Sequence, residues 1–356
     1  MIDEDTFLPH NAARHLLPSF SSGFSKAGNC KCILNRAINE PLVDDAFCLN
    51  VLNPRQEESK NLRDILENQD FIFDFSASIA VSHYLANSDS FVRSMSAYLT
   101  PNGKCLVLAM EDEKRSIRLD WLEMLQYREV INDSLLFNSL NVPEYHRYGN
   151  SCRDISVRLS QDDFAIWSGF SSKKIRENVQ KTDASLDIFV RCNFEIKHIV
   201  VDISNIVEVK ISSWKIIFDE YLINKMSKYR ETSLPNETGG VLLGNFDTEY
   251  EKCYIIDILS APSDSEELPI SFLRGCEGLS DEIENIKGKT LGQVMYVGEW
   301  HSHPNGYSTN PSVADAETFK WLKSNLDQDS IPSIMMIIGE NQSISIIGAE
   351  PPVINP

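Results

Sequence analysis

Residues 298–304 have the sequence Gly-Glu-Trp-His-Ser-His-Pro, and residues 312–315 have the sequence Ser-Val-Ala-Asp. Alternate side chains of a strand point to the same side, so His301 and His303, at the end of a strand predicted over 294–300, can converge on one ion. Asp315, near the start of a helix predicted over 312–326, can supply a third ligand. Two imidazoles and one carboxylate are a typical catalytic zinc set that leaves a fourth position for water. The pattern therefore predicts a zinc hydrolase.

The water on such a zinc ion still needs a group that takes its proton. The candidate is Glu237, which precedes an apolar strand predicted over 239–244. Taken singly, the same residues have simpler interpretations. Glu237 fits a surface carboxylate, Trp300 fits core packing better than substrate contact, and Ser312 with Asp315 fits a helix capping box. The last interpretation is compatible with a role at the site, because a capping residue can still face it.

Glu237, His301-Ser302-His303-Pro304 and the Ser312–Asp315 stretch together resemble the motif of the JAB/MPN (JAMM) metalloproteases. The resemblance covers residues 205–349 and implies an α+β domain of the cytidine-deaminase-like kind. It implies that both histidines and Asp315 bind Zn²⁺, that Glu237 activates the water and then protonates the leaving amine, and that the Ser312 hydroxyl steadies the oxyanion. The segment between His303 and Asp315 is one residue longer than is usual in the family, and we expect the turn-rich residues 305–311 to absorb it.

The first half of the chain alternates between strand-like and helix-like segments. Strands are predicted over 71–75, 105–110, 186–190 and 198–203, and helices over 80–99 and 161–179. This alternation indicates an α/β domain with a mostly parallel sheet. The pattern resets near residue 205, where 207–226 is predicted as an amphipathic helix, and further strands are expected over 253–259, 334–338 and 343–347. We therefore expect two domains, 1–203 and 204–356.

Residues 3–15 resemble the Asp-x-Asp … Asn-x-x-Arg stretch of the ThiF/ubiquitin-activating adenylation fold. The resemblance extends over about the first 200 residues and implies an incomplete Rossmann-like domain. It implies that Asp3 matches the acid that holds the nucleotide ribose, and that Asn11 and Arg14 match the residues that reach the phosphates. Lys26 matches the phosphate-binding lysine of that fold.

Two further positions match the same fold. Asp74 corresponds to its magnesium-binding aspartate, and Cys152 lies where the family often places its thioester cysteine. The chain has no Gly-x-Gly-x-x-Gly loop, whose backbone N–H groups would hold the nucleotide phosphates. We therefore expect a truncated adenylation domain or one fragment of a split gene, and doubtful binding of ATP and Mg²⁺.

The bulk composition limits the partners. A net charge of −19 argues against nucleic acid and anionic membranes. The acidic start lacks the apolar segment of a signal peptide, and no apolar stretch is long enough to span a bilayer. The eight cysteines lack the spacing of a disulfide framework. These features predict a cytoplasmic protein with reduced thiols.

The leading hypothesis is a zinc-dependent isopeptidase that removes a ubiquitin-like protein from its conjugates or trims its tail. The two resemblances together are similar to bacterial ubiquitin-like conjugation systems, several of which act in antiphage defence, so a conjugating enzyme is a further expected partner. One alternative is an activating enzyme, or a fragment of one, with an accessory peptidase. Another is a non-catalytic scaffold, although scaffolds of the MPN kind typically lack the histidines or the aspartate.

Overall fold

The computed structural model describes residues 1–12, 15, 17–41, 43, 45–141, 159–326 and 331–349. The chain divides into two compact units. The first consists of Met1–Asp120 with Val142–Val200, and the second of Trp121–Asn141 with Val201–Pro356. Arg14 and Cys152 lie outside the described residues. Within the described ranges, no helix has the length and apolar character needed to cross a membrane.

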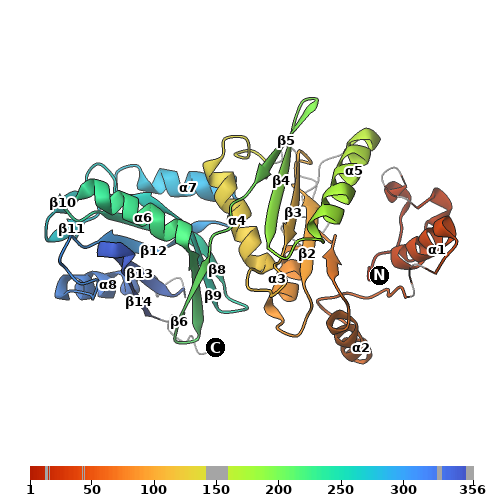
Figure 1. Cartoon of the computed structure of the whole chain (residues 1–356), viewed down its shortest axis with the longest axis horizontal. Coiled ribbons are helices and arrows are strands. Elements are labelled where there is room, and N and C mark those ends of the chain that lie inside the picture. The colour runs from red at the N-terminus through yellow and green to blue at the C-terminus, as the bar shows by residue number, and fades with distance from the viewer. Residues whose placement is uncertain are drawn as a thin grey trace. The chain divides into compact units, whose positions relative to one another are not determined.

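The first unit contains a five-stranded sheet with the strand order β1-β2-β3-β4-β5 (Figure 1). Its strands are β1 (Ile72–Asp74), β2 (Ser94–Leu99), β3 (Cys105–Met110), β4 (Ser185–Cys192) and β5 (Glu195–Val200). Only β1 and β2 are parallel, so the prediction of a mostly parallel sheet is wrong. The reason is local: the turn at 100–104, with Gly103 at φ +69°, joins β2 directly to β3. Strands joined by so short a turn must run antiparallel.

The helices of the first unit are α1 (Lys26–Ile38), α2 (Gln56–Glu67), α3 (Ile79–Asn87) and α5 (Gln161–Asn178), and two short 3-10 turns occur at Pro9–Asn11 and Ser19–Ser21. The predicted helix over 161–179 is confirmed, and the Ser160 side chain caps it by accepting from the backbone N–H of Asp163. The predicted helix over 80–99 is only half right. It ends at Asn87, and the buried strand β2 takes up its second half.

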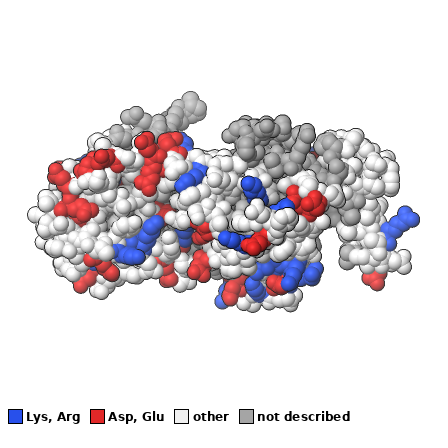
Figure 2. All heavy atoms as spheres, turned by 90° about the horizontal axis from the view of Figure 1, so that it is seen from above, with Lys and Arg blue, Asp and Glu red and all other residues white. Residues whose placement is uncertain are grey.

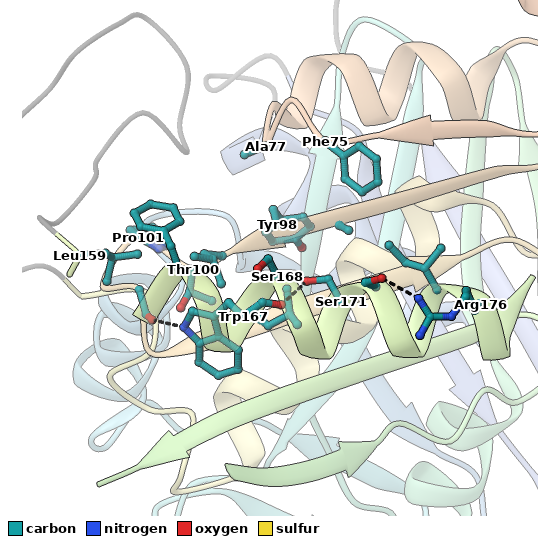
Figure 3. A pocket seen from close by; sticks show the side chains of 17 residues that line it. Phe75, Ala77, Tyr98, Thr100, Pro101, Leu159, Trp167, Ser168, Ser171 and Arg176 are labelled. Atoms are coloured by element: carbon teal, nitrogen blue, oxygen red, sulfur yellow. Dashed lines mark hydrogen bonds between the residues drawn. The ribbon is translucent and has the colours of Figure 1, made fainter. Parts of the chain in front are cut away.

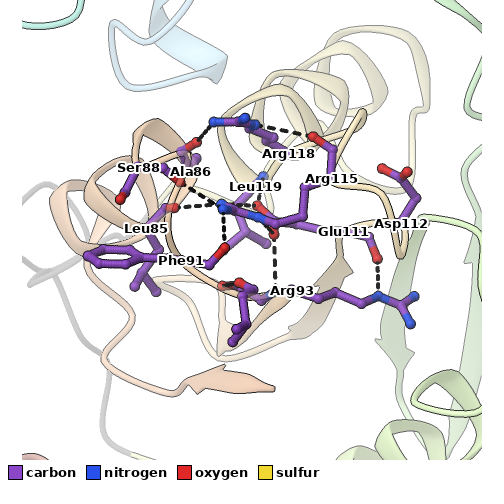
Figure 4. Close-up of polar contacts among 12 residues, drawn as sticks. Leu85, Ala86, Ser88, Phe91, Arg93, Glu111, Asp112, Arg115, Arg118 and Leu119 are labelled. Carbon is purple, nitrogen blue, oxygen red and sulfur yellow. Dashed lines mark hydrogen bonds and ion pairs between the residues drawn. The ribbon is translucent and has the colours of Figure 1, made fainter. Parts of the chain in front are cut away.

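Two arginines hold the end of α3 (Figure 4). The last carbonyl groups of a helix have no partner within the helix. Arg115 and Arg118 donate to carbonyl groups at the end of α3 and just beyond it, those of Leu85, Ala86, Ser88 and Phe91. Arg115 also pairs with Glu111, whose carboxyl pKa is raised by burial in spite of this neighbour. The cluster fixes the point at which the chain leaves α3 and turns toward β2.

The second unit contains a seven-stranded mixed sheet with the order β14-β13-β12-β8-β9-β7-β6 (Figure 1). Its strands are β6 (Ile206–Ile211), β7 (Trp214–Asp219), β8 (Gly239–Asp247), β9 (Lys252–Ser260), β12 (Met295–Ser302), β13 (Ser333–Ile338) and β14 (Ile344–Ala349). A separate hairpin is formed by β10 (Glu266–Leu268) and β11 (Ser271–Leu273). β12 lies inside the sheet, parallel to β13 and antiparallel to β8. The strands predicted over 239–244, 253–259, 294–300, 334–338 and 343–347 are confirmed.

The helices of the second unit are α4 (Leu119–Asn132, from Trp121 onward), α6 (Glu220–Ser233), α7 (Leu279–Lys289) and α8 (Val313–Leu326), with a 3-10 turn at Glu340–Gln342. α6 packs on β7, β9 and β13, α7 packs on β12, and α8 packs on β13. The predicted helix over 207–226 is wrong in its first half, which forms the hairpin of β6 and β7. The core beneath α6 includes Phe218, Leu222, Met226 and Trp300, and Trp300 is 1% exposed, as its core interpretation predicted.

The helix α4 was not expected in this unit, yet buried polar contacts fasten it there. Arg128 makes two hydrogen bonds of 2.8 Å to the carboxylate of Asp219 and donates from Nε to the carbonyl of Ile256. Asp219 in turn caps the start of α6. Asn132 donates to Asp257 at 2.7 Å. Residues 121–141 therefore fold with the second unit although they precede residue 142 of the first.

Both signs of charge occur on the face shown in Figure 2, and acidic side chains are spread widely over it. This distribution agrees with the net charge of −19. Basic side chains that are buried, such as Arg128 and Arg230, contact partners inside the second unit. Acidic residues outnumber basic residues among the buried charged side chains, so part of the net negative charge lies inside the protein.

Candidate metal centre

The end of β12 brings both histidines to the same place. His301 lies opposite Gly239 of β8 and Ile337 of β13. Beyond the strand, the backbone N–H of His303 still donates to the carbonyl of Ile338 at 2.9 Å. Ser302 points the other way and is fully buried, and its hydroxyl accepts from the N–H of Thr238. This alternation places both imidazoles on one side, as the spacing predicted.

Asp315, in the first turn of α8, completes a three-residue cluster. The Nε2 atoms of His301 and His303 are 3.3 Å apart, and the Asp315 carboxylate lies 3.0 Å from the first and 3.5 Å from the second. Tetrahedral zinc with bonds of about 2.0–2.1 Å requires ligand atoms about 3.3–3.4 Å apart. The three donor atoms therefore fit a zinc ion, with one coordination position left for water.

The hydrogen bonding of His303 selects the ring nitrogen that faces this cluster. Its Nδ1 lies 2.6 Å from the carbonyl of Ser308, which can only accept a hydrogen bond. The proton is therefore on Nδ1, and Nε2 presents a lone pair to a metal. The hydrogen bond with Asp315 raises the pKa of His303. Burial alone would raise the pKa of Asp315, but the two histidines outweigh burial and hold it far below its usual range.

Glu237 lies at the entrance to β8, beside the cluster. Burial raises the pKa of its carboxyl group, and the charges of His301, His303 and Asp315 all act on it. Its backbone N–H donates to the carbonyl of Leu268 in the hairpin β10–β11. A half-buried carboxylate with a raised pKa, close to two histidines, is well suited to accept a proton from water.

Ser312 and Asp315 form the reciprocal pair that the capping-box pattern predicted. The N–H of Asp315 donates to Ser312 Oγ at 3.1 Å, and the N–H of Ser312 donates to Asp315 Oδ2 at 2.6 Å. The cap uses a lone pair of the Ser312 hydroxyl and leaves its proton for another acceptor. One carboxylate oxygen of Asp315 thus fixes the helix start while the group as a whole faces the histidines.

Sequence reasoning missed the contacts that attach the hairpin β10–β11 to the strands of the site. Arg274, just after β11, makes two hydrogen bonds of 2.8 and 3.0 Å to Glu299 of β12. Tyr296 donates to the same carboxylate. Thr238 donates to Glu267 of β10 at 2.5 Å. The hairpin is therefore fixed to β12 and to the residue after Glu237, and its apolar side chains Leu268, Ile270 and Leu273 remain exposed.

The predicted nucleotide residues of the first unit make local contacts. Asp3 accepts from the N–H of Asp5, Asn11 accepts from the N–H of Leu8, and Lys26 pairs with Asp5. The buried carboxylate of Asp74 accepts four hydrogen bonds of 2.6–2.9 Å from three serines: Ser76, Ser82 and Ser96. Asp74 is therefore already saturated by the protein.

A cavity of about 740 Å³ in the first unit lies between the sheet and α5 (Figure 3). Apolar side chains such as Phe75, Leu106 and Trp167 form most of its wall, and Arg176 lies near one end, bonded to Ser172. Among the residues that the structure describes, the lining includes neither Asp3, Asn11, Lys26 nor Asp74. The adenylation resemblance therefore did not indicate this cavity through those four positions.

Comparison with known proteins agrees with the geometry of the second unit. Residues 219–347 match the family described as prokaryotic homologs of the JAB domain. Proteins named CD-NTase/cGAS isopeptidase are similar: one from Enterobacter hormaechei subsp. hoffmannii is 35% identical over 104 residues, which cover 29% of this chain and 56% of that protein. Another, from Escherichia coli, is 25% identical over 126 residues, 33% of this chain and 72% of that protein.

The chain thus spans little more than half the length of the first of these relatives. A solution structure of a Desulfitobacterium hafniense protein is also similar, at 18% identity and a TM-score of 0.26, and covers 36% of this chain and 79% of its own. The matched residues contain the histidines, Asp315 and Glu237. Residues 219–347 therefore form a JAB domain of the prokaryotic kind.

Proposed function

We propose that the chain is a zinc-dependent isopeptidase that releases a ubiquitin-like protein from an amine to which it is conjugated. The observation that carries the proposal is the convergence of His301, His303 and Asp315 at zinc-ligand spacing, with Glu237 beside them. The similarity to proteins named CD-NTase/cGAS isopeptidase supports the substrate class. A ubiquitin-like protein conjugated to a CD-NTase is therefore the first substrate to test.

His301, His303 and Asp315 would hold the ion, which when bound supplies a Lewis acid and lowers the pKa of water. Glu237 takes a proton from the attacking water as the oxygen bonds to the amide carbon. It then delivers that proton to the leaving nitrogen as the C–N bond breaks, so that a carboxylate and an amine are released. The Ser312 hydroxyl donates a hydrogen bond to the carbonyl oxygen of the substrate as negative charge develops on that oxygen.

The hairpin β10–β11 gives the substrate tail a place to lie. Its exposed apolar side chains stand next to Glu237, whose N–H is bonded to Leu268. An extended peptide can add to such a hairpin as a further strand. The substrate amide would then lie across the end of β12, near both Glu237 and the histidines.

For the first unit we propose no adenylation by this chain alone, since Asp74 and Lys26 already have partners within the protein. ATP–pyrophosphate exchange tests this statement directly. Exchange by the purified chain would contradict it.

The test of the isopeptidase is the Glu237→Gln variant, assayed with zinc and a ubiquitin-like protein fused or conjugated through its tail. Removal of the general base should lower the rate by about 10²–10⁴-fold and leave zinc content unchanged, because Glu237 is not a ligand. Glu282→Gln, which changes an exposed carboxylate of α7, serves as the matched control. Equal cleavage by wild type and Glu237→Gln would refute the assigned base.

A further inference from the structure

Arg230, in the last turn of α6, is buried with two neutral acceptors. It is 5% exposed. Its Nε–H donates to the carbonyl of His303 at 2.7 Å, and its Nη2–H donates to the side-chain oxygen of Asn305 at 2.6 Å. Both acceptors belong to the segment that follows β12. Burying a guanidinium costs free energy that two neutral acceptors offset only in part. A buried group with such a cost, next to the candidate metal centre, indicates that the contact of Arg230 with His303 and Asn305 has a role in that centre.

The contacts of His303 show what Arg230 can control. The backbone N–H of His303 is held by the carbonyl of Ile338, its Nδ1 by the carbonyl of Ser308, and its own carbonyl by Arg230. The first contact is an extension of the sheet. The second depends on the path of residues 304–308, because Ser308 is the exposed end of that segment. The orientation of the His303 imidazole therefore depends on how firmly residues 304–308 are held in place.

Arg230 fixes that segment at two points, His303 and Asn305. The neighbouring Gly306 is bonded to the carboxylate of Glu340 at 3.3 Å, which adds a third, weaker point. This is also the segment that is one residue longer than the family pattern. A planar guanidinium presents its donors in a fixed fork, so it sets the distance between its two acceptors, which a lysine cannot do.

We infer that Arg230 is a positioning residue of the metal centre, which holds His303 and the loop 304–308 so that Nε2 of His303 faces the ion. The inference rests on the zinc site of the proposed function. Outer contacts that orient a ligand change metal affinity by about 10–100-fold. The residue acts through His303 and touches neither the ion nor the substrate.

The test compares zinc affinity, measured by competition with a chromogenic chelator, and the visible spectrum of the Co²⁺-substituted protein. Arg230→Met should bind zinc about 10–100-fold more weakly than wild type and show an altered Co²⁺ spectrum. Arg230→Lys should recover only part of the loss, because one ammonium cannot span both acceptors. Asn305→Ala removes one arm at an exposed position, so it should fold normally and show a smaller loss in the same direction.

The matched control is Arg128→Lys. Arg128 is also a buried arginine that contacts α6, but it acts at Asp219, eleven residues before Arg230 and so about 16 Å away along the helix. It should lower stability without changing zinc affinity or the Co²⁺ spectrum. If wild type binds no zinc, the proposed function fails. If wild type binds zinc and the folded Arg230 and Asn305 variants bind it equally well, the positioning role alone is refuted.

Discussion

Substitution of Ser312 separates the two roles that one hydroxyl can have at the start of α8. Its oxygen accepts from the N–H of Asp315 at 3.1 Å, and its proton is free to donate to substrate. Ser312→Ala removes both functions. Ser312→Gly also removes the hydroxyl, but glycine is tolerated at the N-cap at a cost of only a few tenths of a kcal/mol. The pair of variants therefore changes stability and catalysis by different amounts.

The expected magnitudes follow from these contacts. Ser312→Ala should destabilise the second unit by about 1 kcal/mol, since the second hydrogen bond of the cap, from the N–H of Ser312 to Asp315, does not need the side chain. For a unit of this size that is a fall in Tm of about 2–4 °C. Loss of an oxyanion donor should lower kcat by about 10²–10³-fold in both variants.

The assay measures kcat on a saturating conjugate together with the zinc-bound Tm of each variant. Equal losses of kcat in Ser312→Ala and Ser312→Gly, with unequal losses of Tm, are the expected result. Wild-type kcat in Ser312→Gly would refute the catalytic role and leave Ser312 as a helix cap. The catalytic role would also be refuted if the loss of kcat in the two variants were proportional to their loss of Tm.

Three other predictions concern the metal, the strand beneath it and the first unit. Zinc at 100 times its Kd should stabilise the second unit by about 2.7 kcal/mol. A chelator should therefore lower the Tm of the wild type by about 5–10 °C and leave the Tm of His301→Ala unchanged. An unchanged wild-type Tm would contradict the metal site. A Cβ on Gly239 would overlap Phe272 and the carbonyl of Trp300, next to His301. Gly239→Ala should therefore lower the free energy of unfolding, measured in urea, by about 1–3 kcal/mol and weaken zinc binding. Unchanged stability and zinc affinity would contradict this prediction, because they would show that the strand adjusts freely. Burial alone would raise the pKa of Asp187, but hydrogen bonds from Asn178, Lys174 and His198 lower it. A folded-state pKa below the unfolded value of about 3.9 gives stability that is present above that pH and lost below it. Asp187→Asn should therefore be less stable than wild type at pH 7 and less sensitive to acid below about pH 4, and parallel urea–pH curves for the two proteins would disprove this.

The convergence of His301, His303 and Asp315 could be predicted from the sequence because it depends on short-range geometry. His301 and His303 share one strand end, and Asp315 opens the next helix, so alternation along a strand and a capping pattern are enough to bring them together. The structure places all three at ligand spacing. Glu237 precedes β8 and is far from the other three in sequence, and only its surrounding motif indicated it.

The second unit also shows where periodicity misleads. Ile211, Trp214, Phe218 and Leu222 recur at helical spacing, yet the segment forms β6 and β7 and only then α6. Val207, Val209 and Ile211 also alternate, and branched side chains favour a strand. A turn with Ser212 at φ +52° then reverses the chain. The segment thus carries both a helical spacing and a strand alternation of apolar residues. The pairing of β7 with β9 stabilises the strand conformation.

Other contacts lie beyond any pattern in the sequence. Arg230 donates to a backbone carbonyl, and every residue type offers such an acceptor. Arg274 and Glu299 form a pair only because the hairpin β10–β11 folds back onto β12. Neither arginine has a spacing rule that would mark it. The structure was needed to find them because they depend on how distant elements pack.

The chain crosses between the two units more than once, and this limits how the two units can be recombined during evolution. The chain passes from one unit to the other after residues 120, 141 and 200. A single recombination event near residue 200 could not exchange the second unit whole, because it would leave behind the helix whose Arg128 neutralises the buried Asp219. Removing one partner of such a buried pair costs about 3–5 kcal/mol. The two units are therefore expected to be inherited together and to diversify by point substitution rather than by shuffling of modules.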